Sequence, residues 1–135
     1  MVTLSAVLIF VHSAFAASIT LTATGTWGDA DDWTPNQVPG VGDAIFIGAA
    51  GNFSVRVVSG DEAFGESGTA SEWSSQSNPF LLMNNGNLVH TNGSVLNWTP
   101  SAGTPILSLG TPYDFINNGT FNVSATVGTK YMDHG

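Results

Sequence analysis

"NNGNLVHTNGSVLNWT" (residues 84–99) contains two short strand-like runs, and an Asn-Gly pair stands before each of them. Asn and Gly adopt the backbone conformations that tight turns require, so each pair predicts a turn that leads into a strand. A related run, "NNGTFNVSA", follows at residues 117–125. Asn-Gly hairpins between antiparallel strands would give a sandwich, whereas Asn-Gly corners between parallel strands would give a β-helix with stacked asparagines. The spacing of the runs does not distinguish these two folds.

The same alternation of strand and turn extends over most of the chain. No stretch carries the apolar spacing of an amphipathic helix over several turns, and Gly or Pro interrupts the sequence at short intervals. We therefore predict an all-β protein. The expected strands, bounded by Gly, Asn-Gly or Pro, cover residues 18–23, 44–48, 53–58, 80–83, 87–91, 94–99, 105–110 and 120–127.

One segment, residues 60–79, lacks this pattern because Ser, Gly and acidic residues dominate it. We expect an exposed loop or a β-helix insertion there, with Phe64 and Trp73 as its bulky anchors. The closing sequence has no terminal capping pattern, so we expect the chain to be the N-terminal part of a longer protein or a truncated gene product. The expected organisation is a signal peptide, a cap with the first strands, the exposed loop and the β-helix coils, over residues 1–16, 17–59, 60–79 and 80–135 respectively.

The first residues predict secretion. The chain is apolar from Val2 to Val11 and then ends this region with the small-x-small pattern Ala14-Phe15-Ala16, which is typical of a cleaved signal peptide. No later stretch is long and apolar enough to span a membrane, so we expect an extracellular or cell-surface protein. Sequons that a eukaryotic secretory route would glycosylate begin at Asn52, Asn92, Asn97, Asn118 and Asn122.

The composition is acidic and free of cysteine. Two Lys or Arg residues stand against ten Asp or Glu residues, which gives a formal net charge of −8. Such a chain is repelled by phosphate backbones and by anionic membrane surfaces, so we exclude nucleic acid as a partner. Without disulfides, a small secreted domain needs another source of stability, and stacked strands with fully paired backbones provide one.

The tryptophans have two interpretations. Trp27 and Trp33 stand in a turn-rich region, where their indoles would close the open end of a solenoid core. Exposed indoles would instead stack on sugar rings. The candidates for carbohydrate stacking are Trp27, Trp33, Trp73 and Trp98.

Acidic residues supply candidates for metal binding and for catalysis. A solvated turn explains the acids around the first two tryptophans, and a structural calcium ion is the alternative because Ca²⁺ prefers oxygen ligands. The candidate ligands are Asp29, Asp31, Asp32 and Asp43. Glycosidase chemistry needs two positioned carboxylates. The carboxylates of the expected loop are those of Asp61, Glu62, Glu66 and Glu72.

These carboxylates do not form a recognisable catalytic constellation with the rest of the chain. They stand on an expected loop without a basic partner nearby. Arg56 and His90 lie in alternating strands, where we interpret both as solvent-facing residues. We therefore assign no catalytic residue, expect no enzymatic activity of this chain, and expect no cofactor apart from structural calcium.

The run from Trp27 through Trp33 to the turn Pro39-Gly40-x-Gly42-Asp43, followed by a Val/Ile-type strand, resembles the start of secreted right-handed β-helix surface proteins of the adhesin type. It is also similar to the glycine-rich extracellular G8 domain. The resemblance implies the start of a right-handed parallel β-helix with an N-terminal cap. It implies a structural or adhesive role, with extracellular polysaccharide or matrix and cell-surface components as partners. The alternatives are the N-terminal part of a polysaccharide-degrading β-helix enzyme and a carbohydrate-binding antiparallel β-sandwich.

Overall fold

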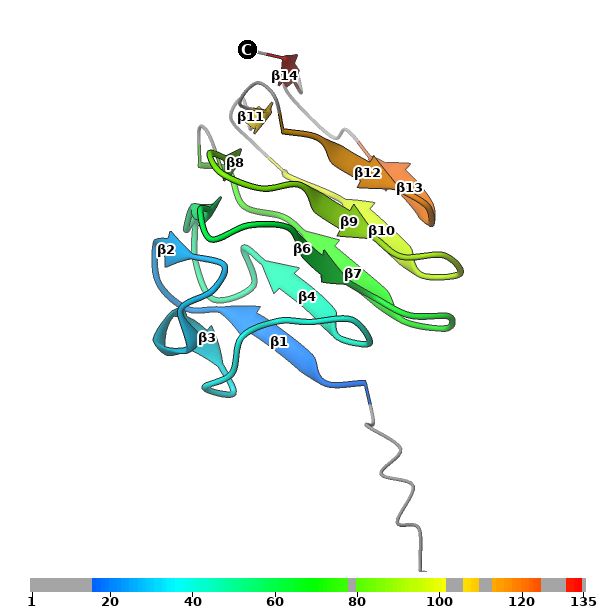
Figure 1. Cartoon of the computed structure of the whole chain (residues 1–135), viewed down its shortest axis with the longest axis horizontal. Coiled ribbons are helices and arrows are strands. Elements are labelled where there is room, and N and C mark those ends of the chain that lie inside the picture. The colour runs from blue at the N-terminus through cyan, green and yellow to red at the C-terminus, as the bar shows by residue number, and fades with distance from the viewer. Residues whose placement is uncertain (1–15, 78–79, 102–105, 110–112, 125–130, 135) are drawn as a thin grey trace, which may run out of the picture.

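The computed structural model describes residues 16–77, 80–101, 106–109, 113–124 and 131–134. Their strands form three sheets, which we call sheets 1, 2 and 3 (Figure 1). Sheet 1 consists, in spatial order, of β3 (Trp33–Thr34), β1 (Ser18–Leu21), β4 (Ala44–Ile47), β7 (Ala70–Trp73), β10 (Val95–Trp98) and β13 (Thr120–Val123). Sheet 2 consists of β2 (Gly25–Thr26), β5 (Val55–Val57), β8 (Leu81–Met83), β11 (Ile106–Leu109) and β14 (Tyr131–His134). Sheet 3 consists of β6 (Glu62–Phe64), β9 (Leu88–His90) and β12 (Phe115–Asn117).

Neighbouring strands in these sheets come from successive coils of the chain, as the stacked arrows in Figure 1 show. β9, for example, pairs in parallel with β6 on one side and with β12 on the other. Within the described residues, only the pair of β1 and β3 is antiparallel. The fold is a parallel β-solenoid of about four turns. It confirms the all-β prediction and the interpretation of Asn-Gly as a corner between parallel strands.

The interior of the solenoid is filled by alternate residues of each strand and by a continuous aromatic cluster. In β5, Val55 and Val57 are fully buried while Arg56 between them is exposed, as the alternating sequence predicts. The aromatic rings follow one another along the stack, with centroid separations of 5.3 to 6.1 Å. This cluster contains Trp27, Trp33, Phe64, Trp73, Phe80, Trp98, Phe115 and Phe121.

A cap closes the N-terminal end of the stack. The short strand β3 pairs with the outer edge of β1, after a single 3-10 turn at Ala30–Asp32. The Trp33 indole N–H donates to the Trp27 carbonyl at 3.2 Å, and the Trp27 indole N–H donates to the Pro39 carbonyl at 3.3 Å. Both rings are buried with their polar atoms paired, which satisfies the requirement for a buried indole. These two tryptophans therefore close the end of the core, as the sequence predicts.

The prediction of an exposed loop over residues 60–79 is wrong, because this segment contains β6 and β7 and contributes to the core. β7 alternates between exposed and buried residues, and its buried members are Ser71 and Trp73. The Ser71 hydroxyl accepts a hydrogen bond from the Ile45 backbone N–H at 2.9 Å. A hydroxyl that is paired in this way can occupy an inward position without a large desolvation cost. The sequence concealed this strand because one of its two inward residues is polar.

The Asn-Gly pairs occupy two different corners. Residues 91–93 and 118–119 connect sheet 3 to sheet 1 in successive coils, whereas residues 84–86 connect sheet 2 to sheet 3. Gly93 has a φ of 78°, a conformation that favours glycine. In the described part of the chain, no helix has the length and apolar character needed to cross a membrane. The expected signal peptide lies outside the described residues except for Ala16.

Candidate functional site

The indoles proposed for sugar stacking are inside the solenoid. Trp27 and Trp73 are fully buried, and Trp33 and Trp98 are each 2% exposed. Trp73 is surrounded by rings at 5.4 to 5.8 Å, those of Phe64 and Phe80 among them. A sugar ring needs an open aromatic face, so this placement corrects the prediction of a stacking site on these four residues. Their role is to fill the coil interiors.

His90 is also buried, which corrects its interpretation as a surface residue. Its imidazole stacks on the Phe64 ring with centroids 5.0 Å apart, and its side chain is fully excluded from solvent. Its Nδ1 lies 2.6 Å from Oδ1 of Asn117, whose Nδ2 in turn donates to the Gly119 carbonyl. That second bond orients the amide, so the oxygen accepts and His90 Nδ1 carries the hydrogen. The imidazole has a structural position in the stack of Phe64, His90 and Asn117.

The acids of the N-terminal turn accept hydrogen bonds from the turn itself. Asp29 accepts the backbone N–H of Asp31 at 3.1 Å and caps the 3-10 turn. Asp31 accepts from the Asn36 amide at 2.7 Å, and Asp32 accepts the Thr26 backbone N–H at 2.8 Å. Each carboxylate therefore fixes a piece of irregular backbone, which is a common role of Asp in turns.

Asp43 has the same function at the start of β4. One carboxylate oxygen accepts from the Ala17 backbone N–H at 3.1 Å, and the other accepts from the Gly40 backbone N–H at 3.0 Å. Across the described ranges, no three Asp, Glu or His side chains come together as a metal-binding group. The structure thus does not assemble the four aspartates Asp29, Asp31, Asp32 and Asp43 into the calcium site considered from the sequence.

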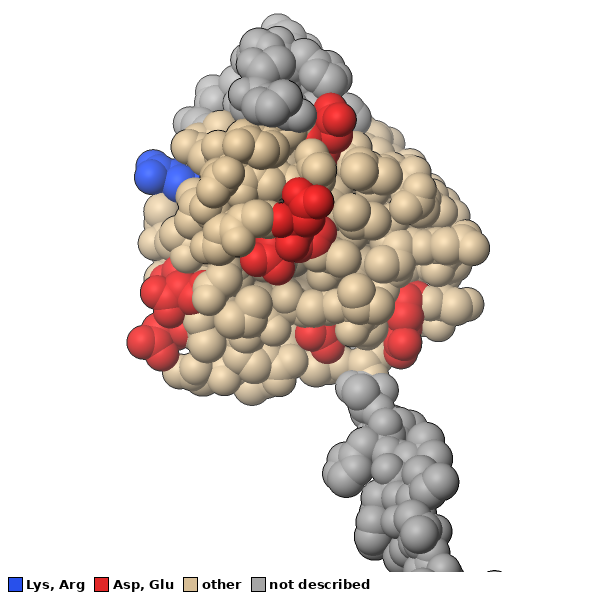
Figure 2. Space-filling model, viewed as in Figure 1, with Lys and Arg blue, Asp and Glu red and all other residues tan. Residues whose placement is uncertain are grey.

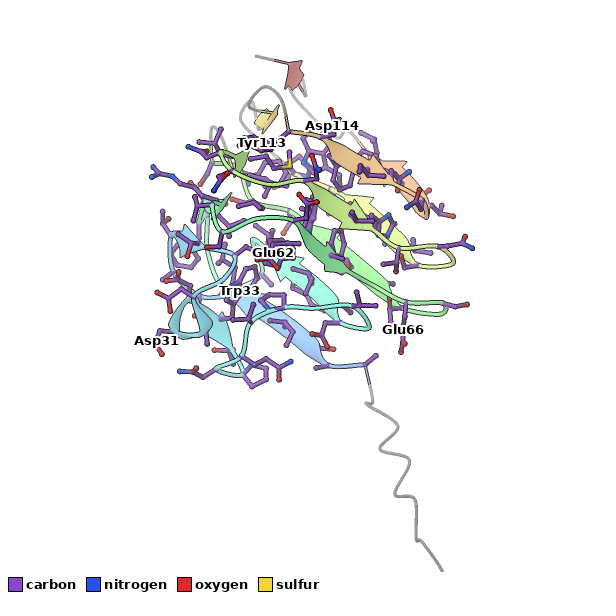
Figure 3. All side chains as sticks on the ribbon, in the orientation of Figure 1. Asp31, Trp33, Glu62, Glu66, Tyr113 and Asp114 are labelled. Carbon is purple, nitrogen blue, oxygen red and sulfur yellow. The ribbon has the colours of Figure 1, made fainter. Side chains whose placement is uncertain are left out.

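The carboxylates of the 60–79 segment are distributed over different faces. Figure 3 shows Glu62 near the middle of the view and Glu66 at its lower right. Glu72 lies on the outer surface of sheet 1. The three glutamates thus belong to different parts of the coil: Glu62 to sheet 3, Glu66 to the turn after β6, and Glu72 to sheet 1. Burial raises the pKa of the Glu62 carboxyl above its usual value, since desolvation penalises its charged form.

A polar ladder runs along the corner between sheets 2 and 3. The Asp61 carboxylate accepts the Asn87 backbone N–H, and the Asn87 side-chain oxygen accepts the Asp114 backbone N–H, both at 2.8 Å. The Tyr113 hydroxyl beside this ladder donates to the Asn85 side-chain oxygen at 2.9 Å. Figure 2 shows that acidic side chains gather on this face, whereas a basic side chain is visible only at its left edge. The corner is therefore an ordered, negatively charged surface.

The sequons divide into corners and strands. Asn52, Asn92 and Asn118 are exposed and lie between strands. Asn97 and Asn122 are aligned on β10 and β13, where Asn122 Nδ2 donates to Asn97 Oδ1 at 3.0 Å. This pair is an asparagine ladder of the kind that the β-helix interpretation predicts. Asn97 is half-buried, and Asn122 is exposed.

No family of known proteins, no curated protein and no solved structure matches this chain. The class of protein is therefore defined by the fold alone, which is a parallel β-solenoid with a buried aromatic cluster. Its ordered features outside the core are side-chain ladders that bridge successive coils. Sequence reasoning missed the corner ladder of Asp61, Asn87 and Asp114, because only the coil register brings these residues together. Their similar spacing along the chain was the signal that could have revealed it.

Proposed function

We propose that this chain is an extracellular structural or adhesive domain without catalytic activity of its own. The observation that carries the proposal is the division of the molecule into a filled core and a bonded outer surface. Aromatic side chains occupy the interior, while polar ladders such as Asp61–Asn87–Asp114 tie one coil to the next. Such a body presents long, rigid faces, which suit a scaffold or an attachment surface.

The sequence supports an extracellular setting for this domain. Its first sixteen residues have the character of a cleaved signal peptide. Exposed sequons at Asn52, Asn92 and Asn118 lie at corners, where an attached glycan projects into solvent without entering a strand. The resemblance of the Trp27–Asp43 run to adhesin-type β-helix proteins points in the same direction. The proposal includes glycans on these three corner asparagines.

Secretion of the tagged chain tests this proposal. The full chain with a C-terminal epitope is expressed in a eukaryotic secretory host, and the medium and cell-surface fractions are analysed by peptide mass spectrometry. We expect cleavage after Ala16 or Ala17 and glycans at the corner sequons. A matched variant with Asn52, Asn92 and Asn118 changed to Gln should be secreted with a lower mass and no glycan. Retention of the uncleaved chain in the cytosol would overturn the proposal.

Adhesion is measured separately on the purified product. Beads coated with the chain are compared with beads coated with an unrelated secreted protein for retention on extracellular matrix and on cell layers. Specific retention supports an adhesive role. Secretion without any retention leaves a purely structural role and refutes the adhesive part.

A further inference from the structure

Sheet 1 carries a column of outward side chains across five neighbouring strands. The strand registers align Thr20 with Phe46, Phe46 with Glu72, Glu72 with Asn97, and Asn97 with Asn122. On β4, β7 and β10, the two residues that flank the column member are buried, as expected where side chains alternate between the two faces of a sheet. Adjacent members of the column are about 4.8 Å apart, the spacing of neighbouring strands.

Phe46 is the unusual member of this column. It is only partly buried, and within the described residues its ring is not part of the aromatic cluster that fills the core. The residues two positions earlier on these strands have shorter side chains than Phe46. They are Ser18, Ala44, Ala70, Val95 and Thr120. Part of a phenyl ring is thus exposed on the outer face of sheet 1, which the buried tryptophans do not provide.

The polar members of the column are held in place but keep free hydrogen-bonding capacity. Asn122 Nδ2 donates to Asn97 Oδ1 at 3.0 Å, and the Thr99 hydroxyl donates to Glu72 Oε1 at 3.2 Å. These bonds fix the side chains before any ligand arrives, which lowers the entropic cost of binding. Asn97 Nδ2, Asn122 Oδ1 and Glu72 Oε2 make no hydrogen bond to another described residue.

We propose that this column, Thr20–Phe46–Glu72–Asn97–Asn122, binds a neutral polysaccharide laid along the solenoid axis. The apolar face of one sugar ring covers Phe46, and hydroxyl groups of the neighbouring units bond to Glu72 and to the asparagine amides. The charge of the face selects the polymer, because a carboxylate stands in the column and no Lys or Arg does. An anionic polysaccharide would be repelled, and a neutral one would not. This inference rests on the proposed extracellular function and names the partner class of that surface.

Affinity electrophoresis of the full chain in native gels tests the inference. The protein is produced in a host that does not glycosylate asparagine, so that Asn122 is unmodified. The gels contain hydroxyethylcellulose or galactomannan as neutral probes and polygalacturonate as the anionic probe. We expect retardation by at least one neutral polymer and none by polygalacturonate.

Matched variants assign the binding to the column. Phe46→Ala should weaken the affinity about tenfold, and Phe46→Tyr should restore it because the ring is kept. Leu82→Ala is the control, since Leu82 is a half-buried outward residue on sheet 2. Thermal melts followed by circular dichroism establish that each variant is folded.

The outcomes separate this inference from the proposed function. Retardation that Phe46→Ala weakens and Leu82→Ala leaves intact supports the inference. Absence of retardation by both neutral polymers overturns it, and so does retardation that Phe46→Ala leaves unchanged or that only polygalacturonate produces. A chain that is secreted and glycosylated but fails these gels refutes the polysaccharide column while the proposed extracellular role stands.

Discussion

Replacing Gly86 by Ala tests the stacking of coils directly. Gly86 lies at the corner between β8 and β9, where it packs on Gly60 of the preceding coil. A methyl group at Gly86 would overlap the Gly60 carbonyl group and would lie 2.9 Å from the Asp61 backbone nitrogen. Both obstacles are backbone atoms, so no side-chain rotation relieves the overlap. The two coils must separate at this corner.

Separation of the coils weakens the hydrogen bonds that cross the corner. The Gly60 N–H donates to the Asn85 carbonyl at 2.8 Å, and the Glu62 N–H donates to the Asn87 carbonyl at 2.9 Å. At this partly exposed corner each hydrogen bond contributes about 0.5–1.5 kcal/mol net. Loss of both bonds, added to about 1–2 kcal/mol of backbone strain from the positive φ of Gly86, lowers the free energy of unfolding by about 2–5 kcal/mol, a large part of the roughly 5–15 kcal/mol that stabilises a typical domain.

Gly68→Ala is the matched control. Gly68 also has a positive φ, of 90°, but a methyl group there would meet no heavy atom within 4 Å. Its expected cost is the left-handed backbone strain alone, about 1–2 kcal/mol. Urea unfolding monitored by fluorescence of the buried tryptophans gives both values. If Gly86→Ala and Gly68→Ala have the same unfolding midpoint, Gly60 and Gly86 are not stacked and the coil register is wrong.

Three further predictions concern the core, the acidic corner and the exposed Asn-Gly pairs. Trp73→Ala should destabilise the protein by about 3–5 kcal/mol in urea unfolding, because it empties the centre of the aromatic cluster; a loss below about 1 kcal/mol would contradict the burial. Because the pKa of the Glu62 carboxyl is raised in the folded protein, Glu62 contributes to stability while it is protonated, below its unfolded-state pKa. This contribution is lost as the pH rises through the folded-state pKa. Glu62→Gln should therefore raise the melting temperature at neutral pH and have little effect in acid, and an equal effect at both would exclude this cause. In unglycosylated protein, Asn92 and Asn118 should deamidate faster than Asn85, because two hydrogen bonds to neighbouring coils hold the Asn85 amide. Peptide mass spectrometry during mildly alkaline incubation measures the three rates, and equal rates would refute this protection of Asn85.

The strands that the sequence predicts well are those with an unambiguous alternation. Val55, Arg56 and Val57 alternate between apolar and charged, and the structure places the two valines inside. His90 shows why the same reasoning fails elsewhere. The run Leu88-Val89-His90 has an apolar residue in both phases, so the local pattern does not decide which face is inward. The stacking of His90 on a ring one coil earlier decides it, and that contact depends on the coil register.

The surface column on sheet 1 was missed for the same reason, because it also depends on the coil register. The column that contains Phe46 and Glu72 consists of residues from different coils, and each looks ordinary in its own strand. The tryptophans were easier to notice because they are rare and large, but their prominence in the sequence reflects the volume of the coil interior. Recognition of the repeat length of one coil in the sequence would have revealed both the surface column and the inward position of the tryptophans. The Asn-Gly runs concealed it, because residues 84–86 and 91–93 belong to different corners of one coil.

The near-constant coil length has a consequence for how such a gene can change. In the two ladders, the bonded pairs Asn97–Asn122, Asp61–Asn87 and Asn87–Asp114 are separated by 25, 26 and 27 positions along the chain. In-frame duplication or deletion of one such unit would return the chain to the same corner, with the strands above and below still in register. Faces such as sheet 1 can thus lengthen or shorten by one strand at a time. The length of the solenoid can therefore change, in evolution or by design, through duplication of coils without changes to its interior.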